Sequence, residues 1–157
     1  MLKNFIILAT TVLIDYFSKY WIVHKLAYHQ YLELLNTKLF GINLFLTYNS
    51  GIAFGIFHTN QQANTLFLIL SAGAIIIMTY LILAKKIVDH IEQLAILLIL
   101  SGAIGNILDR VIYGHVIDFI DFYVVFNKIQ FHWYTFNIAD SVICAGTLLF
   151  TYKIIRG

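Results

Sequence analysis

The chain has 157 residues, of which 61% are hydrophobic and only 11% are charged, and its mean hydropathy is +0.83. Soluble domains carry about 25% charged residues, so this composition excludes a soluble domain and indicates an integral membrane protein. The net charge of +2 is too small to indicate a nucleic-acid-binding surface, and the single cysteine excludes an internal disulfide framework and a cysteine-based zinc site.

Four stretches of the chain are apolar and long enough to cross a bilayer, which takes roughly 20 residues. They lie at about residues 4–23, 64–84, 93–109 and 137–155. The first stretch carries Asp15 and Lys19 inside its apolar region, unlike a cleaved signal peptide, so we interpret it as a retained span. We expect residues 1–157 to form a single membrane-embedded domain.

Strand-like sequence follows the first span and precedes the fourth. Residues 42–49, INLFLTYN, are β-branched and aromatic with partial alternation, which is typical of a strand. Gly51 and Gly55 then permit a bend or the close approach of another chain. Residues 122–136, FYVVFNKIQFHWYTF, are strand-like and rich in aromatic rings, which suit the membrane–water interface. We therefore expect a small sheet at the outer leaflet that shields a site there.

Basic residues near the span ends predict the orientation of the chain. They are denser on one side, where the sequence places Lys3, Lys85, Lys86, Lys153 and Arg156. The denser side is expected to be cytoplasmic, which puts both termini inside. Asp89 and Glu92 then occupy the inner loop, and the remaining acidic residues in or near a span gather at the outer face. These are Asp15, Asp109, Asp118, Asp121 and Asp140.

Two of these carboxylates, Asp118 in VIDF and Asp140 in FNIAD, are the best candidates for chemistry. A carboxylate near lipid is costly, and two that face each other share one proton, as in an aspartic protease. Taken alone, Asp140 near a helix N-terminus is explained by the helix dipole. Asp121 lies three residues after Asp118, on the same face if the segment is helical but on the opposite face if it is a strand. The choice between Asp118 and Asp121 therefore stays open.

Other polar residues are candidates for supporting roles. Asp15 and Lys19 share a helix face, where they either neutralise each other or support the outer pocket. The small residues of 101–105 favour close helix packing, and Arg110 offers a planar fork that suits a neighbouring carboxylate. The histidines show no metal-ligand spacing, so no metal site is expected. Cys144 is interpreted as a small buried apolar residue.

Five blocks carry a family resemblance along the chain. They are DYFSK at 15–19, NSGIAF at 49–54, GAIGNILDR at 102–110, VIDF at 116–119 and FNIAD at 136–140. In this order, and with four spans, they resemble the bacterial lipoprotein signal peptidases, also called type II signal peptidases, which are integral-membrane aspartic proteases. The resemblance covers essentially the whole chain.

The resemblance implies a mainly α-helical integral membrane fold, with four transmembrane helices, a small extracytoplasmic β-cradle and a short periplasmic helix. The implied activity is cleavage of a prolipoprotein just before its diacylglyceryl-modified cysteine, at the outer face of the bacterial inner membrane. The catalytic aspartates fall on Asp118 and Asp140. The supporting positions fall on Asp15, Lys19, Asn49, Gly51, Asn106, Asp109, Arg110, Asn137 and Ala139.

The resemblance also bears on partners. It implies a monomer without a cofactor, whose partners are the diacylated prolipoprotein and membrane lipid, and which is a target of globomycin-type inhibitors. Two other functions remain as alternatives from the residues themselves. A proton- or ion-coupled transporter is disfavoured because the carboxylates cluster at one interface and no inverted repeat is visible. A non-enzymatic scaffold would tolerate asparagine in place of the two aspartates.

Overall fold

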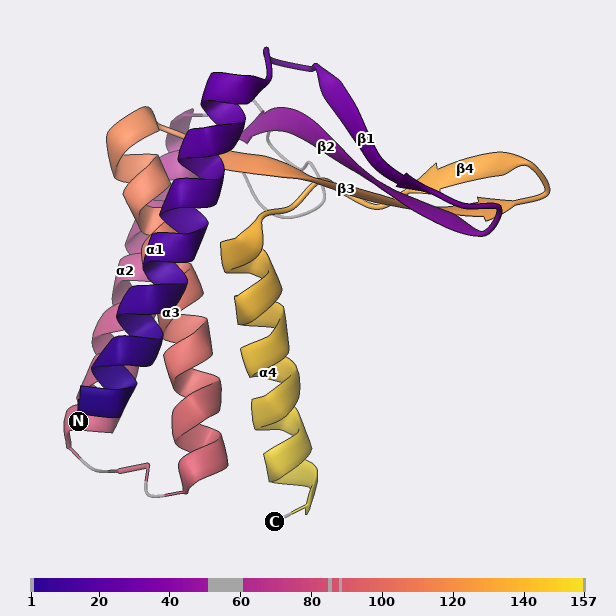
Figure 1. The fold of residues 1–157 in the computed structure, drawn as a ribbon. Coiled ribbons are helices and arrows are strands. Elements are labelled where there is room, and N and C mark those ends of the chain that lie inside the picture. Colours follow the sequence, from indigo (N-terminus) through magenta and orange to yellow (C-terminus); the bar gives the residue numbers. More distant parts are fainter. Residues whose placement is uncertain (1, 51–60, 85, 88, 157) are drawn as a thin grey trace.

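The computed structural model describes residues 2–50, 61–84, 86–87 and 89–156. Gly51 and Gly55, from the glycine-containing segment after the first predicted strand, and Lys85 lie outside the described residues. Within the described residues the chain forms four helices and one four-stranded antiparallel sheet. The helices stand side by side, and the sheet projects sideways from one end of them (Figure 1). The start of the first helix and the end of the last lie at the other end.

Each helix is apolar and long enough to cross a membrane. The helices are α1 (Leu2–Lys25), α2 (Gln61–Leu83), α3 (His90–Tyr113) and α4 (Ile138–Arg156). The four predicted spans are therefore present as helices, and the chain is a multi-pass membrane protein. The short periplasmic helix implied by the family resemblance is not among the described residues.

Helix α3 is longer at both ends than the predicted span of 93–109. It begins after Asp89, whose carboxylate accepts hydrogen bonds from the N–H groups of Ile91 and Glu92 at 2.8 and 3.1 Å. It ends at Gly114, which adopts a left-handed conformation with φ of 76°. These are ordinary N-cap and C-cap arrangements. The first turn carries polar side chains, so hydropathy alone places the start of the helix too late.

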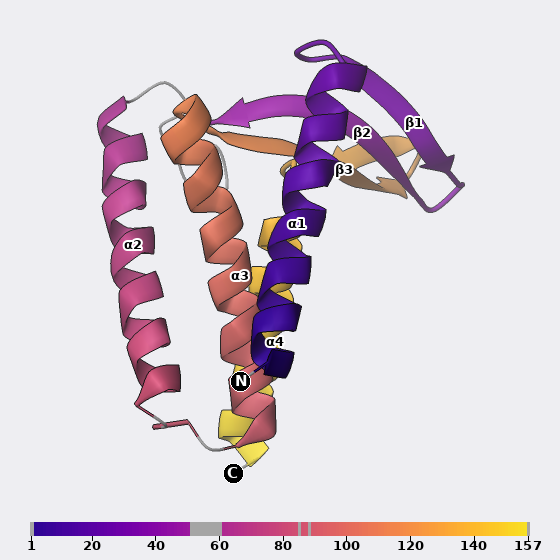
Figure 2. The ribbon, with the colours of Figure 1, turned by 60° about the vertical axis from the view of Figure 1, so that its left-hand side comes forward.

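Helix α3 is the centre of the bundle, since α1, α2 and α4 all pack against it. Figure 2 shows α2 on the far side of α3 from α1. Two glycines of α3 permit close approach. A Cβ added at Gly102 would collide with the carbonyl oxygen of Ala139, and one at Gly105 would lie 2.5 Å from Oδ2 of Asp15. The packing role expected for the small residues of 101–105 is confirmed.

The sheet has the strand order β1-β2-β3-β4, with antiparallel neighbours. Its strands are β1 (Tyr31–Asn36), β2 (Phe40–Asn49), β3 (Val116–Phe126) and β4 (Ile129–His132). Strand β2 contains the predicted segment 42–49. The predicted stretch 122–136 is divided, because Asn127 and Lys128 adopt positive φ angles of 50° and 64° and turn the chain from β3 into β4. Tight hairpin turns of this kind require positive φ at both central residues.

A small apolar core joins the sheet to the end of α1. It consists of buried side chains from α1 and its C-terminal extension, β2 and β3, namely Ile22, Leu26, Leu44, Leu46, Ile117 and Phe119. In the β2–β3 ladder Leu44 pairs with Ile120 and Thr47 with Asp118, so β2 carries one extra residue at an irregularity. Such an irregularity bends a strand and re-aims its side chains. The segment of β3 that carries Asp118 is thereby fixed beside the helices.

Candidate active site

Asp118 lies in β3, opposite Thr47 of β2, and is 2% exposed. Its two carboxylate oxygens accept different hydrogen bonds. Oδ2 accepts from Nδ2 of Asn49 at 3.0 Å, and Oδ1 accepts from Nδ2 of Asn137 at 2.8 Å. The side chains of Asn49, at the end of β2, and of Asn137, just before α4, therefore hold this carboxylate from two directions.

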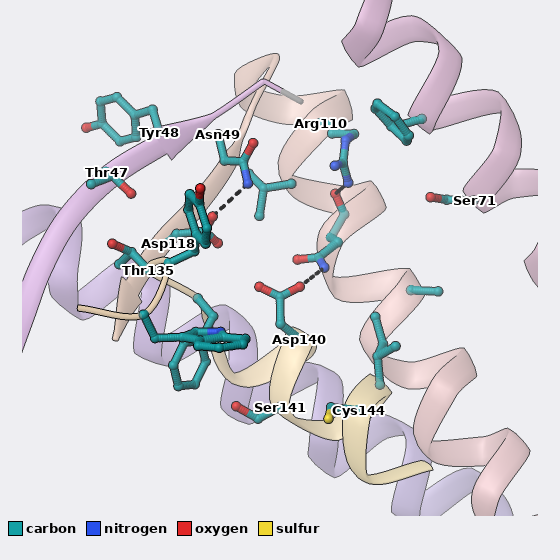
Figure 3. Close-up of a pocket in the computed structure, with 18 of the residues that line it drawn as sticks. Thr47, Tyr48, Asn49, Ser71, Arg110, Asp118, Thr135, Asp140, Ser141 and Cys144 are labelled. Carbon is teal, nitrogen blue, oxygen red and sulfur yellow. Dashed lines mark hydrogen bonds between the residues drawn. The ribbon is translucent and has the colours of Figure 1, made fainter. Parts of the chain in front are cut away.

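Asp140 lies in the first turn of α4 and is joined to Asn137 by a reciprocal cap. Oδ1 of Asn137 accepts from the N–H of Asp140 at 2.8 Å, and Oδ2 of Asp140 accepts from the N–H of Asn137 at 3.2 Å. Such reciprocal bonds satisfy two backbone donors at a helix start. The other oxygen of Asp140, Oδ1, accepts from Nδ2 of Asn106 at 2.8 Å. Figure 3 shows Asp118 and Asp140 bordering the same space.

Asn137 connects the two carboxylates. Its side chain donates to Asp118 while its backbone donates to Asp140, and the residue is completely buried. The same Nδ2 lies 3.2 Å from Oδ1 of Asn106, which in turn binds Asp140. The two aspartates predicted from VIDF and FNIAD are therefore brought together by two asparagines.

Behind this pair lies a buried ionic cluster centred on Lys19. Its Nζ is 2.7 Å from Oδ2 of Asp15 and 2.9 Å from Oδ2 of Asp109. The three side chains are 2%, 2% and 6% exposed, respectively. Asp15 and Lys19 do pair, as their spacing predicts, but the cluster also includes Asp109, far away in the sequence. Asp15 also accepts from the N–H of Ala139 at 2.8 Å.

Arg110 lines the same cavity from α3. Its Nη1 donates to the carbonyl oxygen of Asn106 at 3.3 Å, and its guanidinium lies 5.9 Å from the centroid of the Phe67 ring. Its positive charge also acts on Asp118 and Asp140. Helix α3 continues for about one turn past Arg110, because its C-cap is Gly114, whereas the predicted span ends at residue 109.

Burial gives Asp118 an unusual proton affinity. Loss of hydration raises the pKa of Asp118 to about 7, and the negative charge of Asp140 adds to this rise. The hydrogen bond from Asn49, the charge of Lys19 and the hydrogen bond from Asn137 oppose it. Both desolvation and a neighbouring like charge disfavour the ionised carboxylate. The carboxyl group of Asp118 thus holds its proton until near neutral pH.

The cavity that contains both carboxylates has a volume of about 860 Å³. Its walls come from the sheet, the segment before α4, and helices α2, α3 and α4. Several wall residues were not among the predicted site residues. They are Tyr28, His29, Thr47, Tyr48, Phe67, Ser71, Ala103, Trp133, Tyr134, Thr135 and Ser141. The aromatic character of 122–136 signalled Trp133 and Tyr134, whereas Tyr28 and Phe67 carry no local signal.

Asp121 lies apart from this cavity. One of its oxygens accepts from Asn43 of β2 at 2.9 Å, and the carboxylate lies 2.8 Å from Nδ1 of His132 in β4. It is not among the residues that line the cavity. The strand conformation of β3 therefore separates Asp118 from Asp121, which the spacing of three residues left open.

The interpretation of Cys144 as a buried apolar residue is wrong. It is exposed and lines the cavity one turn after Asp140. Across residues 2–50, 61–84, 86–87 and 89–156, no three His, Cys, Asp or Glu side chains are grouped so that they could hold a metal ion.

These features define a four-helix integral membrane protein in which buried polar groups converge on one large cavity. Residues 7–156 match the family model described as signal peptidase (SPase) II. The chain is similar to the lipoprotein signal peptidase of Janthinobacterium sp. (strain Marseille), with 42% identity over 152 residues, covering 96% of this chain and 86% of that protein. It is similar to the lipoprotein signal peptidase of Francisella tularensis subsp. mediasiatica, with 37% identity over 94% of this chain and 88% of that protein.

The chain is also similar in fold to solved structures of bacterial membrane enzymes. A bacterial membrane enzyme determined by the in meso method at 2.3 Å resolution superposes with a TM-score of 0.83 and 28% identity. The superposition covers 99% of this chain and 89% of that one. The chain belongs to the lipoprotein signal peptidase family, signal peptidase II. Members of this family are proteases that remove signal peptides from prolipoproteins.

Proposed function

We propose that the protein is an aspartic endopeptidase that cleaves prolipoproteins just before the diacylglyceryl-modified cysteine, with Asp118 and Asp140 as its catalytic pair. The observation that carries this proposal is the convergence of two carboxylates on one cavity, the buried Asp118 of β3 and the partly buried Asp140 of α4. The pKa of Asp118, raised to about 7 by burial and by the charge of Asp140, supports a pair that shares one proton.

In the proposed reaction the ionised carboxylate removes a proton from a water molecule, whose oxygen attacks the scissile carbonyl carbon. The protonated carboxyl donates its proton to the carbonyl oxygen, which gives a neutral tetrahedral intermediate. The C–N bond of this intermediate then breaks: the carboxyl that took the proton from water donates it to the leaving amine, and the other carboxylate takes a proton back from a hydroxyl of the intermediate, which restores the pair. Because titration belongs to the pair, acid and base are not assigned to individual aspartates. No covalent acyl-enzyme forms, since water is the nucleophile.

The supporting residues hold this pair in place. Asn49, Asn106 and Asn137 orient the two carboxylates through hydrogen bonds, and Asp15, Lys19, Asp109 and Ala139 lie in the layer behind. Such placement matters because a shift of about 1 Å can lower a rate about 100-fold. Asn49 and the adjacent Gly51 segment are proposed to bind the substrate backbone.

The substrate is proposed to reach the cavity from the membrane. Phe67, Ile143 and Cys144 supply apolar wall from α2 and α4, so the acyl chains can remain in lipid beside these helices while the peptide enters. The sheet end of the bundle then faces the outside of the bacterial inner membrane, and both termini are cytoplasmic. The protein is proposed to act as a monomer and to be inhibited by globomycin-type compounds.

The test is cleavage of a diacylated precursor peptide by the purified protein and by its asparagine variants. Asp118→Asn and Asp140→Asn should each lower kcat by about 1000-fold, as expected for loss of a general acid–base group. Asp121→Asn is the matched control, because it alters a carboxylate of the same strand outside the cavity, and it should retain activity within about threefold. Substantial turnover by either cavity variant would contradict the catalytic pair, and a scaffold protein would show no cleavage in the wild type.

A further inference from the structure

The residues immediately before the two proposed catalytic aspartates are held in the same way. The N–H of Ala139, which precedes Asp140, donates to Oδ1 of Asp15 at 2.8 Å. The N–H of Ile117, which precedes Asp118, donates to Oδ2 of Asp109 at 3.0 Å. For each of the two proposed catalytic aspartates, the N–H of the preceding residue is therefore bound by another, buried carboxylate.

One side chain joins these two outer carboxylates. The ammonium of Lys19 lies 2.7 Å from Asp15 and 2.9 Å from Asp109, with all three side chains almost fully buried. It also donates to Oδ1 of Asn106 at 3.3 Å, and Asn106 donates to Asp140. Asp15 and Lys19 come from α1, and Asn106 and Asp109 come from α3. The two N–H groups that Asp109 and Asp15 bind belong to β3 and α4, respectively.

The cluster is specific in its geometry. Burying one cation with two carboxylates is costly, and an apolar core would join the same helices at least as well. Gly105 adds to the specificity, because any Cβ at this position would lie 2.5 Å from Asp15 Oδ2. The arrangement therefore serves a purpose other than holding α1 against α3.

On the basis of the proposed function, we propose that Lys19 is a positioning residue that sets the spacing of Asp118 and Asp140. It does so by drawing Asp15 and Asp109 toward one ammonium, and with them the peptide groups of Ala139 and Ile117. Lys19 is not among the residues that line the cavity, and it reaches the pair through these carboxylates and Asn106.

Lys19 also contributes charge to the pair. Among the described residues, the charged groups that act on Asp118 include Asp140 from α4, Lys19 from α1 and Arg110 from α3. The positive charge of Lys19 lowers the proton affinity of Asp118. Its removal should therefore leave the pair protonated to a higher pH, which a loss of packing alone would not produce.

The experiment compares Lys19→Met with Lys153→Met in the full-length protein. Lys153 also pairs with an aspartate, Asp89, but at 3.6 Å and at the opposite end of the bundle from the sheet. Lys19→Met should lower kcat about 100-fold with KM nearly unchanged, and should move the alkaline limb of kcat/KM upward by about one pH unit. Lys153→Met should leave both quantities as in the wild type.

A second readout needs no activity. Amide hydrogen exchange at Ile117 and Ala139, measured by NMR, should accelerate about tenfold in Lys19→Met. The amide of Phe119, which donates to the carbonyl oxygen of Phe136 at 3.0 Å, serves as the internal reference. Unchanged exchange at both amides together with an unchanged alkaline limb overturns the proposal.

If Lys19→Met does not fold, the triple variant K19M/D15N/D109N replaces it. Its two asparagines keep an oxygen acceptor for each amide but remove the ionic link, so exchange at Ile117 and Ala139 should still accelerate. Wild-type exchange at both sites in this variant overturns the role of Lys19. Failure of the proposed function is distinguishable, because it appears as a wild-type protein that does not cleave the precursor while the exchange result still stands.

Discussion

Asn137 both caps a helix and holds the two proposed catalytic carboxylates. Its side-chain oxygen caps α4, its side-chain nitrogen holds Asp118, and its backbone N–H holds Asp140. Asn137 is completely buried, and its polar atoms are bound to these partners. The start of α4 and the arrangement of the two carboxylates are therefore parts of one hydrogen-bonded unit.

At the same scale, the pKa of Asp118 predicts the pH dependence of the reaction. With a pKa of about 7, Asp118 is protonated below neutral pH and ionised above it, so under the proposed mechanism the pair loses its shared proton as the pH rises through 7. The general acid is then absent at alkaline pH, so kcat/KM should fall about tenfold per pH unit above pH 7. The acid limb reports the second titration of the pair.

Asparagine variants sharpen this pH prediction. The hydrogen bond from Asn49 stabilises the ionised form of Asp118, so Asn49→Leu should raise the pKa and move the alkaline limb upward by roughly half a pH unit. Asn43→Leu is the control, because Asn43 lies on the same strand but binds Asp121. A pH profile of kcat/KM checks both variants, and equal limbs in the two would contradict the assignment of Asp118.

At the scale of elements, the sequence predicts apolar helices better than their ends or the strands. The four spans follow from hydropathy, whereas the start of α3 depends on the local cap at Asp89. Strand β1 (Tyr31–Asn36) was not predicted, because all six of its residues are exposed and no in–out pattern marks it. The face of Asp118 depends on the pairing of β3 with β2, a contact across about 70 residues that local periodicity does not contain.

Two glycines test the packing of the helices. A Cβ at Gly105 would lie 2.5 Å from Asp15 and 3.3 Å from the Cβ of Ala139, whereas one at Gly73 of α2 meets no atom within 4 Å. Overpacking at such contacts costs about 1–3 kcal/mol, so Gly105→Ala should lower Tm by roughly 5 °C. Gly73→Ala should melt at the wild-type temperature or above it. Thermal unfolding in detergent makes the comparison, and equal Tm values for the two variants would refute the contact.

At the scale of the whole molecule, much of the candidate site could be predicted because its residues stand in recognisable blocks. Asp118, Asp140 and Asn106 do line one cavity, and the buried Asn137 is hydrogen-bonded to Asp118 beside it. The partner of Asp109 could not be predicted, since Arg110 is its neighbour in sequence while Lys19 is its neighbour in space. Tyr28 and Phe67 reach the cavity through the arrangement of separate elements, which no local pattern encodes.

The proposed orientation gives a prediction for the intact protein in its membrane. In a background where the single cysteine is replaced by Cys144→Ala, one new cysteine is introduced at Lys128, in the β3–β4 turn, or at Lys86, before α3. Both positions are exposed. A membrane-impermeant maleimide should label Lys128→Cys in intact spheroplasts, and Lys86→Cys only after lysis. The reverse pattern would place the sheet in the cytoplasm.

The cap at Asn137 determines when, during synthesis and membrane insertion, the two carboxylates can come together. Asp118 receives one of its two hydrogen bonds from Asn137, and Asp140 belongs to α4 itself. During synthesis, α4 follows every other described element and must dock on α3 before Asp140 reaches Asn106. A chain still being inserted into the membrane therefore carries the sheet and three helices but no pair of carboxylates. Under the proposed mechanism, a newly made copy is expected to cleave no substrate until its own α4 has been inserted and docked.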